Sequence, residues 1–354
     1  MAVDRILRSL EIIRSSQAAS GAYLASPNFP TYRYCWFRDG SFIAYAMDLY
    51  GEYESSRRFH TWAASMVNAR EIAVLRAVHA GLSGSAPNAE DILHTRYAVD
   101  GTESGEEWSN HQLDGLGTWV WALEQHQRLS GEALAPDHLH AAGLVADYLV
   151  ALWSQPCFDC WEEFSDQVHP YTLAAIYAGL LAESRLNRRD HAIVLQDIRH
   201  TLLSQGVYQG AFVKFLGSRA VDASLLGLSV PYGVVPPTDE RMYHTVARIE
   251  TELRLAGGGV HRYQADTYYG GGEWLLLTAW LGWYYAELGE MPAAQRLLQW
   301  VESCADPQGN LPEQVPVHLN DPSYYPHWVA HWGEIATPLI WSHAMQLILR
   351  KQME

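Results

Sequence analysis

Apolar residues recur at helical spacing along almost the whole chain, and convincing strand alternation is absent. Ile6, Leu7, Leu10 and Ile13 mark one face of the first such segment, and the last segment repeats the spacing from Leu339. The pattern predicts about twelve helices and an all-α protein. These helices are expected over residues 2–18, 38–51, 53–79, 110–130, 136–153, 168–185, 188–203, 220–228, 239–255, 271–287, 291–303 and 333–350.

The connections between these helices alternate in length. Those after even-numbered helices are short, with the proline-bearing stretch 229–238 the longest of them. Those after odd-numbered helices are long and cover residues 19–37, 80–109, 154–167, 204–219, 256–270 and 304–332. Antiparallel helix hairpins joined in this way place every long loop at one end of the assembly. Six hairpins predict a closed double ring, an (α/α)6 barrel; an open solenoid is the alternative, but the repeated consensus typical of solenoids is not found.

Charge and cysteine content narrow the classes of function. Lys and Arg number 24 against 40 Asp and Glu, a formal net charge of −16, and basic residues form only short pairs, which argues against nucleic acid as a partner. Cys157 and Cys160 have CxxC spacing without a second pair, so two ordinary thiols are expected. The chain has neither a signal-type apolar core at its N-terminus nor a run of about 18 apolar residues, so no membrane partner and a cytoplasmic location are expected.

Tryptophan and tyrosine are unusually prominent. The chain has 14 Trp and 20 Tyr against 8 Phe, and many of them lie in the long loops, which are rich in glycine and proline. These side chains combine a flat apolar face with a polar atom, a combination that suits the C–H faces and hydroxyls of sugar rings. Core packing explains the aromatic residues on helices better than those in loops.

Three groups of carboxylates in the long loops are candidates for acid–base chemistry. Hydrolysis of a glycosidic bond needs one carboxyl to protonate the leaving oxygen and a second to attack or to activate water. Glu162 and Glu163 stand between Trp161 and Phe164, so apolar flanks and an adjacent charge are expected to raise the pKa of Glu162. The second candidate is Glu313, which follows Pro312 and precedes Gln314, a side chain able to orient it or a water; the third is the competing pair Glu106-Glu107. Both pairs also fit acidic residues ahead of a helix N-terminus.

Two further loops pair arginine with aspartate. Arg38 and Asp39 begin a predicted helix, and Arg262 with Asp266 precedes a glycine-rich entry into another. Such pairs can grip vicinal sugar hydroxyls, since one partner donates and the other accepts; a helix cap beside a surface arginine is the alternative. The glycines at 270–272 lack the GK[ST] of a phosphate loop, and no HExxH occurs among the 16 histidines, so neither metal nor cofactor is expected.

Taken in order, the loop motifs resemble family 15 of the glycoside hydrolases, the glucoamylase-like enzymes. The matching stretches, from residue 32 to residue 344, are Y-x-Y-x-W-x-R-D at 32–39, W-x-N-x-Q-x-D-G at 108–115, W-E-E at 161–163, D-A-S-L-L at 222–226, R-Y-x-x-D-x-Y-Y-x-G-x-x-W at 262–274, L-P-E-Q at 311–314 and P-L-x-W-S-H-A at 338–344. The resemblance implies an (α/α)6 barrel and an exo-acting, inverting α-glucosidase that releases β-glucose from non-reducing ends.

The resemblance also implies residue roles. Glu162 would be the general acid and Glu313 the general base, with about 6.5–9.5 Å between the carboxyls of an inverting enzyme. The implied substrate-binding residues are Tyr32, Trp36, Arg38, Asp39, Trp108, Trp161, Glu163, Arg262 and Asp266.

The chain departs from many family members because its predicted helices run almost from end to end, leaving no room for accessory domains. We therefore expect one catalytic domain over residues 1–354 and short substrates, similar to those of isomaltose glucohydrolases, with α-1,6-linked oligosaccharides foremost. The alternatives are a glucoamylase acting on α-1,4-linked malto-oligosaccharides and an α,α-trehalase of the same family. A phosphorylase of this fold and a sugar-binding protein without activity are further alternatives, against which the two separate carboxylates argue.

Overall fold

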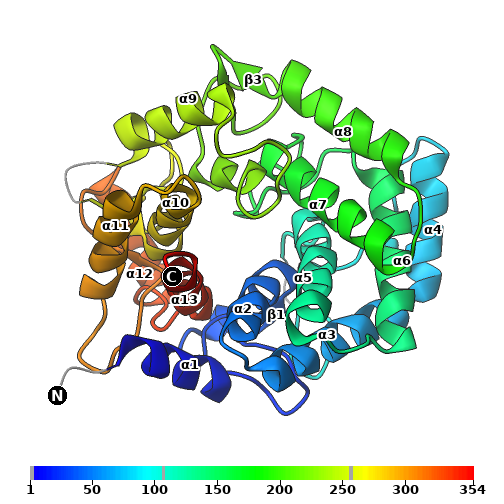
Figure 1. Ribbon diagram of the computed structural model, residues 1–354, viewed down its shortest axis with the longest axis horizontal. Helices are drawn as coiled ribbons and strands as arrows, with labels where there is room; N and C mark the ends of the chain where they lie inside the picture. The colour runs from blue at the N-terminus through cyan, green and yellow to red at the C-terminus, as the bar shows by residue number, and fades with distance from the viewer. Residues whose placement is uncertain (1–3, 106–107, 255–257) are drawn as a thin grey trace.

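A closed ring of helices forms the centre of the molecule. The computed structural model describes residues 4–105, 108–254 and 258–354. In the inner ring each helix contacts the next and the last contacts the first (Figure 1). Its members are α2 (Phe37–Leu49), α5 (Asp114–Ser130), α7 (Pro170–Leu186), the 3-10 helix η3 (Ala223–Leu228), α10 (Leu275–Glu287) and α13 (Ile340–Gln352). An outer ring surrounds them, made of α1 (Arg5–Ser15), α3 (Tyr53–Asn68), α4 (Glu71–Leu82), α6 (Pro136–Leu152), α8 (Ala192–Gln205), α9 (Glu240–Arg248) and α11 (Met291–Ser303). The predicted (α/α)6 barrel is confirmed.

The two rings differ in how their helices are patterned, because the inner helices are covered on every side. Helix α10 reads LLLTAWLGWYYAE and buries nearly all of its residues, whereas α11 buries only one stripe. Helices α5 and α7 approach most closely at Gly117 and Gly179. A Cβ atom at Gly117 would lie 2.4 Å from the carbonyl oxygen of Ala175, so only glycine fits between these two backbones.

Several predicted helix boundaries differ from the structure. The helix expected over 53–79 is interrupted at Ala69 and Arg70, so it forms α3 and α4. The apolar spacing continues across this break, which is why periodicity alone does not detect it. The segment expected as an α-helix over 220–228 is the tighter η3, whose N-cap is Asp222. Helix α9 ends at Arg248 and passes into a π-turn over Ile249–Leu253. Helix α12 (Tyr325–Trp332), within a segment expected to be loop, buries none of its residues.

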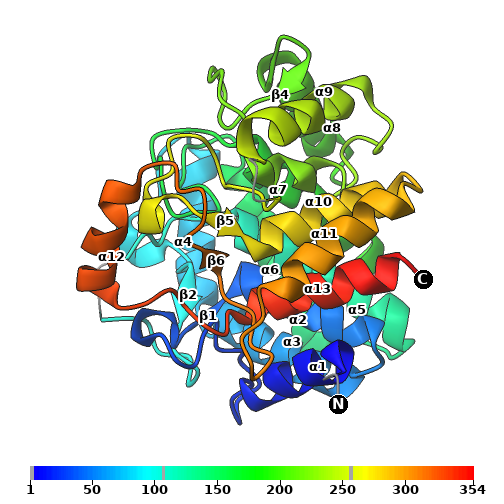
Figure 2. The same ribbon diagram turned by 90° about the vertical axis from the view of Figure 1, so that its left-hand side faces the viewer.

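Short strand pairs, which the sequence analysis did not predict, join the long loops to one another. Strand β1 (Cys35–Trp36) pairs with β2 (Arg96–Tyr97), and β5 (Glu273–Trp274) pairs with β6 (Gln314–Val315). Strands β1 and β5 lead directly into the inner helices α2 and α10. Figure 2 shows these pairs and α12 toward one end of the barrel, with the C-terminus at the other. The long loops therefore gather at one end, as predicted.

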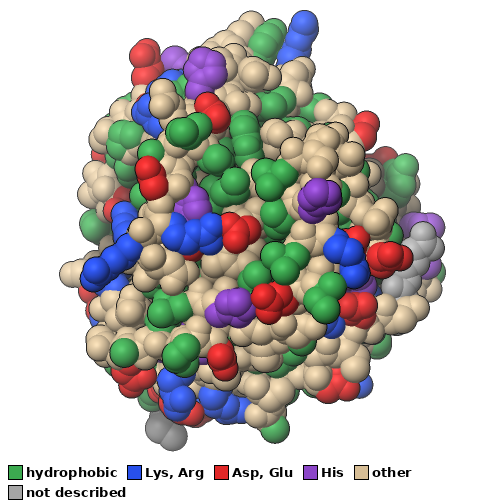
Figure 3. Space-filling model, turned by 90° about the vertical axis from the view of Figure 1, so that its right-hand side faces the viewer, with side chains coloured by type: hydrophobic (Ala, Val, Ile, Leu, Met, Phe, Trp, Pro, Cys, Tyr) green, Lys and Arg blue, Asp and Glu red, His purple; other side chains and the backbone are tan. Residues whose placement is uncertain are grey.

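Charged side chains of both signs are interspersed over the face that includes α4 and α6 (Figure 3). All four cysteines are free, and Cys157 and Cys160 are both buried. Among the described residues, none of the helices has the length and apolar character needed to cross a bilayer.

Candidate active site

A pocket of about 450 Å³ opens at the end of the barrel where the long loops gather. Its wall includes Glu162 and Glu313, which two different loops contribute. The other predicted site residues that line it are Tyr32, Trp36, Arg38, Asp39, Trp108, Trp161, Glu163 and Arg262. Asp266 lies behind this wall, and the competing pair Glu106-Glu107 lies outside the described residues. The fold therefore brings Tyr32 and Glu313, which are 281 residues apart in the chain, into one concavity.

The turn that carries Glu162 has an unusual backbone conformation. Glu162 has a φ of 66°, in the left-handed region that residues other than glycine rarely adopt. Asp159 holds the turn, because its Oδ1 accepts the N–H groups of Trp161 and Glu163 at 2.9 Å each. The Glu162 N–H donates to the carbonyl oxygen of Asp159, also at 2.9 Å. Strained conformations persist only where surrounding contacts determine them, and here those contacts set the position of the carboxyl.

A buried lysine lies against this turn. Lys214 Nζ is 2.9 Å from Asp159 Oδ2 and 2.7 Å from Asp222 Oδ2, and the lysine side chain is 4% exposed. Asp222 also accepts the indole N–H of Trp161 and the N–H of Ser224. A cation held between two carboxylates compensates charges whose burial would otherwise be costly. The Glu162 loop is thereby fastened to the start of η3.

The environment of Glu162 favours its protonated form. Its Oε1 accepts the indole N–H of Trp36 at 2.7 Å and lies 3.7 Å from a guanidinium nitrogen of Arg38. Burial raises the pKa of Glu162 to about 7, because desolvation penalises the carboxylate more than Arg38 and Trp36 stabilise it. The charge of Asp39 adds to the rise. A carboxyl with this pKa can carry a proton near neutral pH.

Glu163 differs from its neighbour in its contacts. It accepts a hydrogen bond from the Tyr263 hydroxyl and lies 3.5 Å from a guanidinium nitrogen of Arg262. Asp39, not Glu163, is the negative charge among the main contributions to the raised pKa of Glu162. Burial raises the pKa of Glu163 itself, and the charge of Arg262 acts against that rise.

Glu313 is the more deeply buried of the two proposed catalytic carboxyls, at 3% exposure. Its Oε1 accepts the hydroxyl of Tyr32 at 3.1 Å, and that hydroxyl is 2.9 Å from the hydroxyl of Tyr268. Its Oε2 is buried and has no hydrogen-bond partner in the part of the chain that the structure describes. Burial raises the pKa of Glu313 to about 8, against the lowering effects of Tyr32 and Arg262. One carboxylate oxygen is thus anchored, and the other is available for a water or a substrate hydroxyl.

Two arginines provide the cationic groups of the pocket wall. The guanidinium of Arg38 lies 3.0 Å from Asp39 and 3.7 Å from Asp114. Arg262 donates its Nε–H to Asp266 at 2.8 Å, and a second guanidinium nitrogen also bonds Asp266. Asp266 is fully buried, so the structure places it as the group that holds Arg262 in position. Both guanidinium groups keep their charge and present fixed donors to the pocket.

Several residues of the wall were not among the predicted site residues. Tyr268, Trp274 and Trp341 come from the inner helices or the loops before them, and Trp328 and Trp332 come from α12. The motif around Arg262 contains Tyr268 and Trp274, and the clustering of tryptophan in residues 328–341 was the available signal for the others. Arg96, also unpredicted, lies 3.5 Å from the ring centroid of Trp108 and supports it from behind.

Gln314 has a role different from the expected one. Its side-chain oxygen accepts the N–H of Gly272 at 2.9 Å, and its side-chain nitrogen donates to the carbonyl of Tyr268 at 3.3 Å. The expectation that Gln314 orients Glu313 or a water is therefore wrong. Its amide instead fastens the glycine-rich loop to the loop that carries Glu313.

Two buried carboxyls, two arginine–aspartate pairs and an aromatic wall at the mouth of a helical barrel are typical of enzymes that hydrolyse carbohydrates. Comparisons with known proteins agree with this class of enzyme. The family described as "Glycosyl hydrolases family 15" matches residues 2–323. An isomaltose glucohydrolase from Kribbella flavida is 42% identical over 97% of this chain and 90% of its own length. A trehalase from Sulfolobus acidocaldarius, "Trehalase 2", is 25% identical over 94% of this chain and 62% of its own length.

A solved structure of a glycosidase variant in complex with glucose superposes with a TM-score of 0.94 at 40% identity, covering 99% of this chain and 96% of that one. The chain belongs to glycoside hydrolase family 15, and it is a glycoside hydrolase.

Proposed function

We propose that this protein is an exo-acting, inverting α-glucosidase that removes β-glucose from the non-reducing ends of short α-glucosides, with isomaltose and other α-1,6-linked oligosaccharides as preferred substrates. The similarity to an isomaltose glucohydrolase over nearly the whole chain supports the substrate. The glucose complex of a similar glycosidase supports glucose as the product. A hydrophobic core cluster that runs from Leu10 to Leu349 supports a single catalytic domain over the 354 residues.

The observation that carries this proposal is the pair of buried carboxyls in one pocket. Glu162 donates its proton to the glycosidic oxygen as the bond to the anomeric carbon breaks. Glu313 accepts a proton from a water, whose oxygen attacks the anomeric carbon from the opposite face. The α-linked sugar leaves as β-glucose, and the aglycone leaves as an alcohol. The partner-free Oε2 of Glu313 is the atom suited to hold that water.

The arginines and tryptophans supply binding and orientation. Arg38 and Arg262 are held by Asp39 and Asp266, so their N–H groups are already in place when a sugar hydroxyl arrives. Such preformed donors reduce the entropy lost on binding. Trp108 completes an aromatic wall and is itself stacked by a guanidinium group.

A panel of substrates tests the proposed linkage preference. Glucose release should be fastest from isomaltose, slower from maltose and trehalose, and slowest from dextran and starch, because a pocket of about 450 Å³ suits short substrates. Proton NMR of the first product should show β-glucose. Trehalose as the best substrate would identify a trehalase, and maltose as the best would identify a malto-oligosaccharide hydrolase. Dependence of turnover on phosphate would identify a phosphorylase, and α-glucose as the first product would reject inversion.

The pH dependence follows from the two raised pKa values. Activity requires protonated Glu162 and ionised Glu313, so it falls at low pH as Glu313 gains a proton and at high pH as Glu162 loses one. Burial raises their pKa values to about 7 and about 8. A profile of kcat/KM against pH should therefore be bell-shaped, with both limbs above about 4.3, the ordinary pKa of a glutamate.

The variant Trp36→Phe gives this pH prediction a matched comparison. It removes the indole N–H that stabilises ionised Glu162, so the pKa of Glu162 should rise and the pH profile should move upward with it. Limbs at or below the ordinary glutamate value in the wild type, or a downward shift of the high-pH limb in the variant, would contradict the assignment of Glu162 as the acid.

A further inference from the structure

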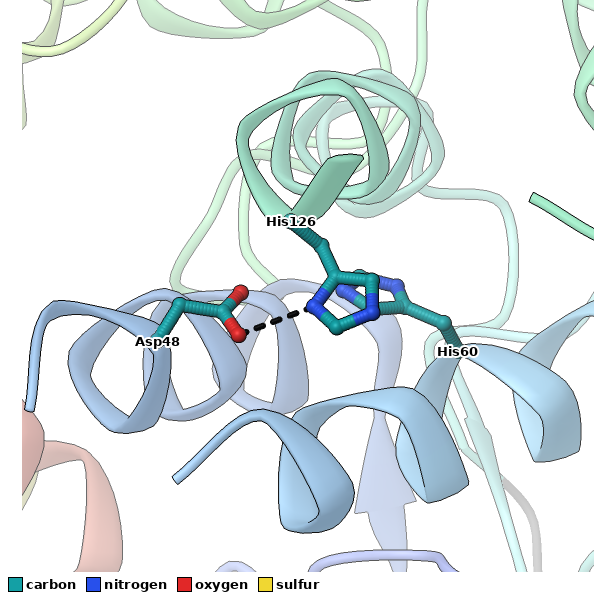
Figure 4. A group of neighbouring side chains, drawn as sticks. All are labelled: Asp48, His60 and His126. Atoms are coloured by element: carbon teal, nitrogen blue, oxygen red, sulfur yellow. Dashed lines mark hydrogen bonds and ion pairs between the residues drawn. The ribbon is translucent and has the colours of Figure 1, made fainter. Parts of the chain in front are cut away.

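A second cluster of ionisable side chains lies inside the barrel wall, away from the pocket. Asp48 comes from α2, His60 from α3 and His126 from α5, and they are 2%, 0% and 2% exposed (Figure 4). One candidate ligand atom from each residue lies within 4.8 Å of the others. Asp48 follows Asp39 by nine residues on the same helix, which places it roughly 14 Å farther along α2 from the active-site pocket.

The cluster is incompletely bonded. Asp48 Oδ1 is 2.8 Å from His126 Nδ1, and its Oδ2 accepts the Ser56 hydroxyl at 2.8 Å. Both ring nitrogens of His60 are buried and have no hydrogen-bond partner within residues 4–105, 108–254 and 258–354. A buried polar atom without a partner is destabilising, because it has lost its hydrogen bonds to water. The His60 ring lies 5.2 Å from that of His126, at an interplanar angle of 38°. The structure thus holds a fully buried imidazole next to a carboxylate and a second imidazole, and no group among the described residues bonds it.

Two imidazoles and a carboxylate form a donor set suited to a divalent transition metal. Zinc binds imidazole nitrogen and carboxylate oxygen in tetrahedral sites, and it commonly takes three protein ligands with a fourth position left for water. The Ser56 hydroxyl, on Asp48 Oδ2, is the kind of supporting hydrogen bond that orients a ligating carboxylate. We propose that Asp48, His60 and His126 bind a divalent transition metal of the zinc class.

The other charged and titratable groups near the cluster are few. His138 comes from α6 and is 3.1 Å from the Thr61 hydroxyl, which places it beyond His60. Glu132 contributes a more distant negative charge. A bound divalent cation would bond His60, neutralise Asp48 and displace any proton that the ligands hold to solvent. It would join α2, α3 and α5 at a point remote from the active-site pocket, so its role is structural.

Metal content tests the proposal directly. The full-length protein is produced in medium supplemented with zinc sulfate, exchanged into metal-free buffer and analysed by inductively coupled plasma mass spectrometry. The wild type should contain about one zinc ion per chain. His60→Phe keeps a ring of similar size without ligand atoms, and it should contain less than a tenth as much. Asp48→Asn, which is nearly isosteric, serves as a second variant if His60→Phe does not fold.

A control variant tests whether the bound zinc lies instead at a pair of surface histidines. His327 and His331 on α12 lie with their rings parallel, 6.3 Å apart, and such a pair can retain zinc by itself. His331→Ala should leave the zinc content unchanged. Removal of zinc by a chelator should lower the Tm of the wild type and of His331→Ala by several degrees without moving that of His60→Phe. Less than a tenth of an equivalent in the wild type, equal zinc in His60→Phe, or loss of zinc in His331→Ala would overturn the proposal.

Discussion

Replacement of Glu162 by Gln is expected to lower kcat on isomaltose by a factor of about 10² to 10⁴, because the amide cannot donate a proton to the leaving oxygen. The same substitution at Glu313 is expected to lower kcat by a similar factor, because the amide cannot accept a proton from water. Both side chains keep their size, so the buried surroundings stay filled. Steady-state kinetics with purified variants, together with circular dichroism to verify folding, measure the effect.

A substrate with an activated leaving group separates the two roles. Fluoride leaves α-glucosyl fluoride without needing a proton, so Glu162→Gln should recover most of its activity on this substrate while Glu313→Gln should not. Glu163→Gln is the matched control, since it changes the adjacent residue of the same turn. It should raise KM and leave kcat within about tenfold of the wild type, because its contacts are with Tyr263 and Arg262. Near-wild-type turnover on isomaltose in either of the first two variants would refute its proposed role.

Replacement of Lys214 by Met is the second substitution for which we expect a large effect, in this case on the free energy of unfolding. The lysine is buried between Asp159 and Asp222, and removing one partner of a buried ion pair costs about 3–5 kcal/mol of unfolding free energy. Urea unfolding measures this loss. Lys351, the other lysine of the chain, is partly exposed, pairs with Glu354 and lies 5.8 Å from the ring centroid of Tyr50, so Lys351→Met should change stability by about 1 kcal/mol or less.

The kinetics of Lys214→Met test whether the lysine positions the general acid. Asp159 holds the left-handed turn of Glu162, so loss of the lysine should lower kcat on isomaltose more than it raises KM, and activity on α-glucosyl fluoride should fall less. Lys214→Arg retains the charge and should recover part of both stability and kcat. A stable, fully active Lys214→Met would show that Asp159 holds the turn without the cation.

The fold was predictable from the sequence because helix periodicity and loop length are local properties. The apolar spacing located most of the inner and outer helices, and the alternation of short and long connections predicted the ring. The break at Ala69, the 3-10 geometry of η3 and helix α12 were not predictable in this way. Tertiary packing decides each of these features. The apolar spacing continues unchanged through the break at Ala69 and through η3, so it signals neither of them.

For the candidate site, too, the sequence predicted some features and the tertiary structure decided others. The sequence by itself indicated Glu162, Glu313, Arg38 and Arg262 as site residues, because their motifs occur in loops that a closed ring of helices must bring to one end. It missed four tryptophans of the pocket wall, Trp274, Trp328, Trp332 and Trp341. Only the tertiary structure decided what each site residue does. It separated Glu162 from Glu163, placed Asp266 behind Arg262 and Lys214 beside Asp159, and brought His60 to Asp48 and His126. Burial and partner distance set the pKa and the bonding of a side chain, and both depend on residues that are remote in the chain.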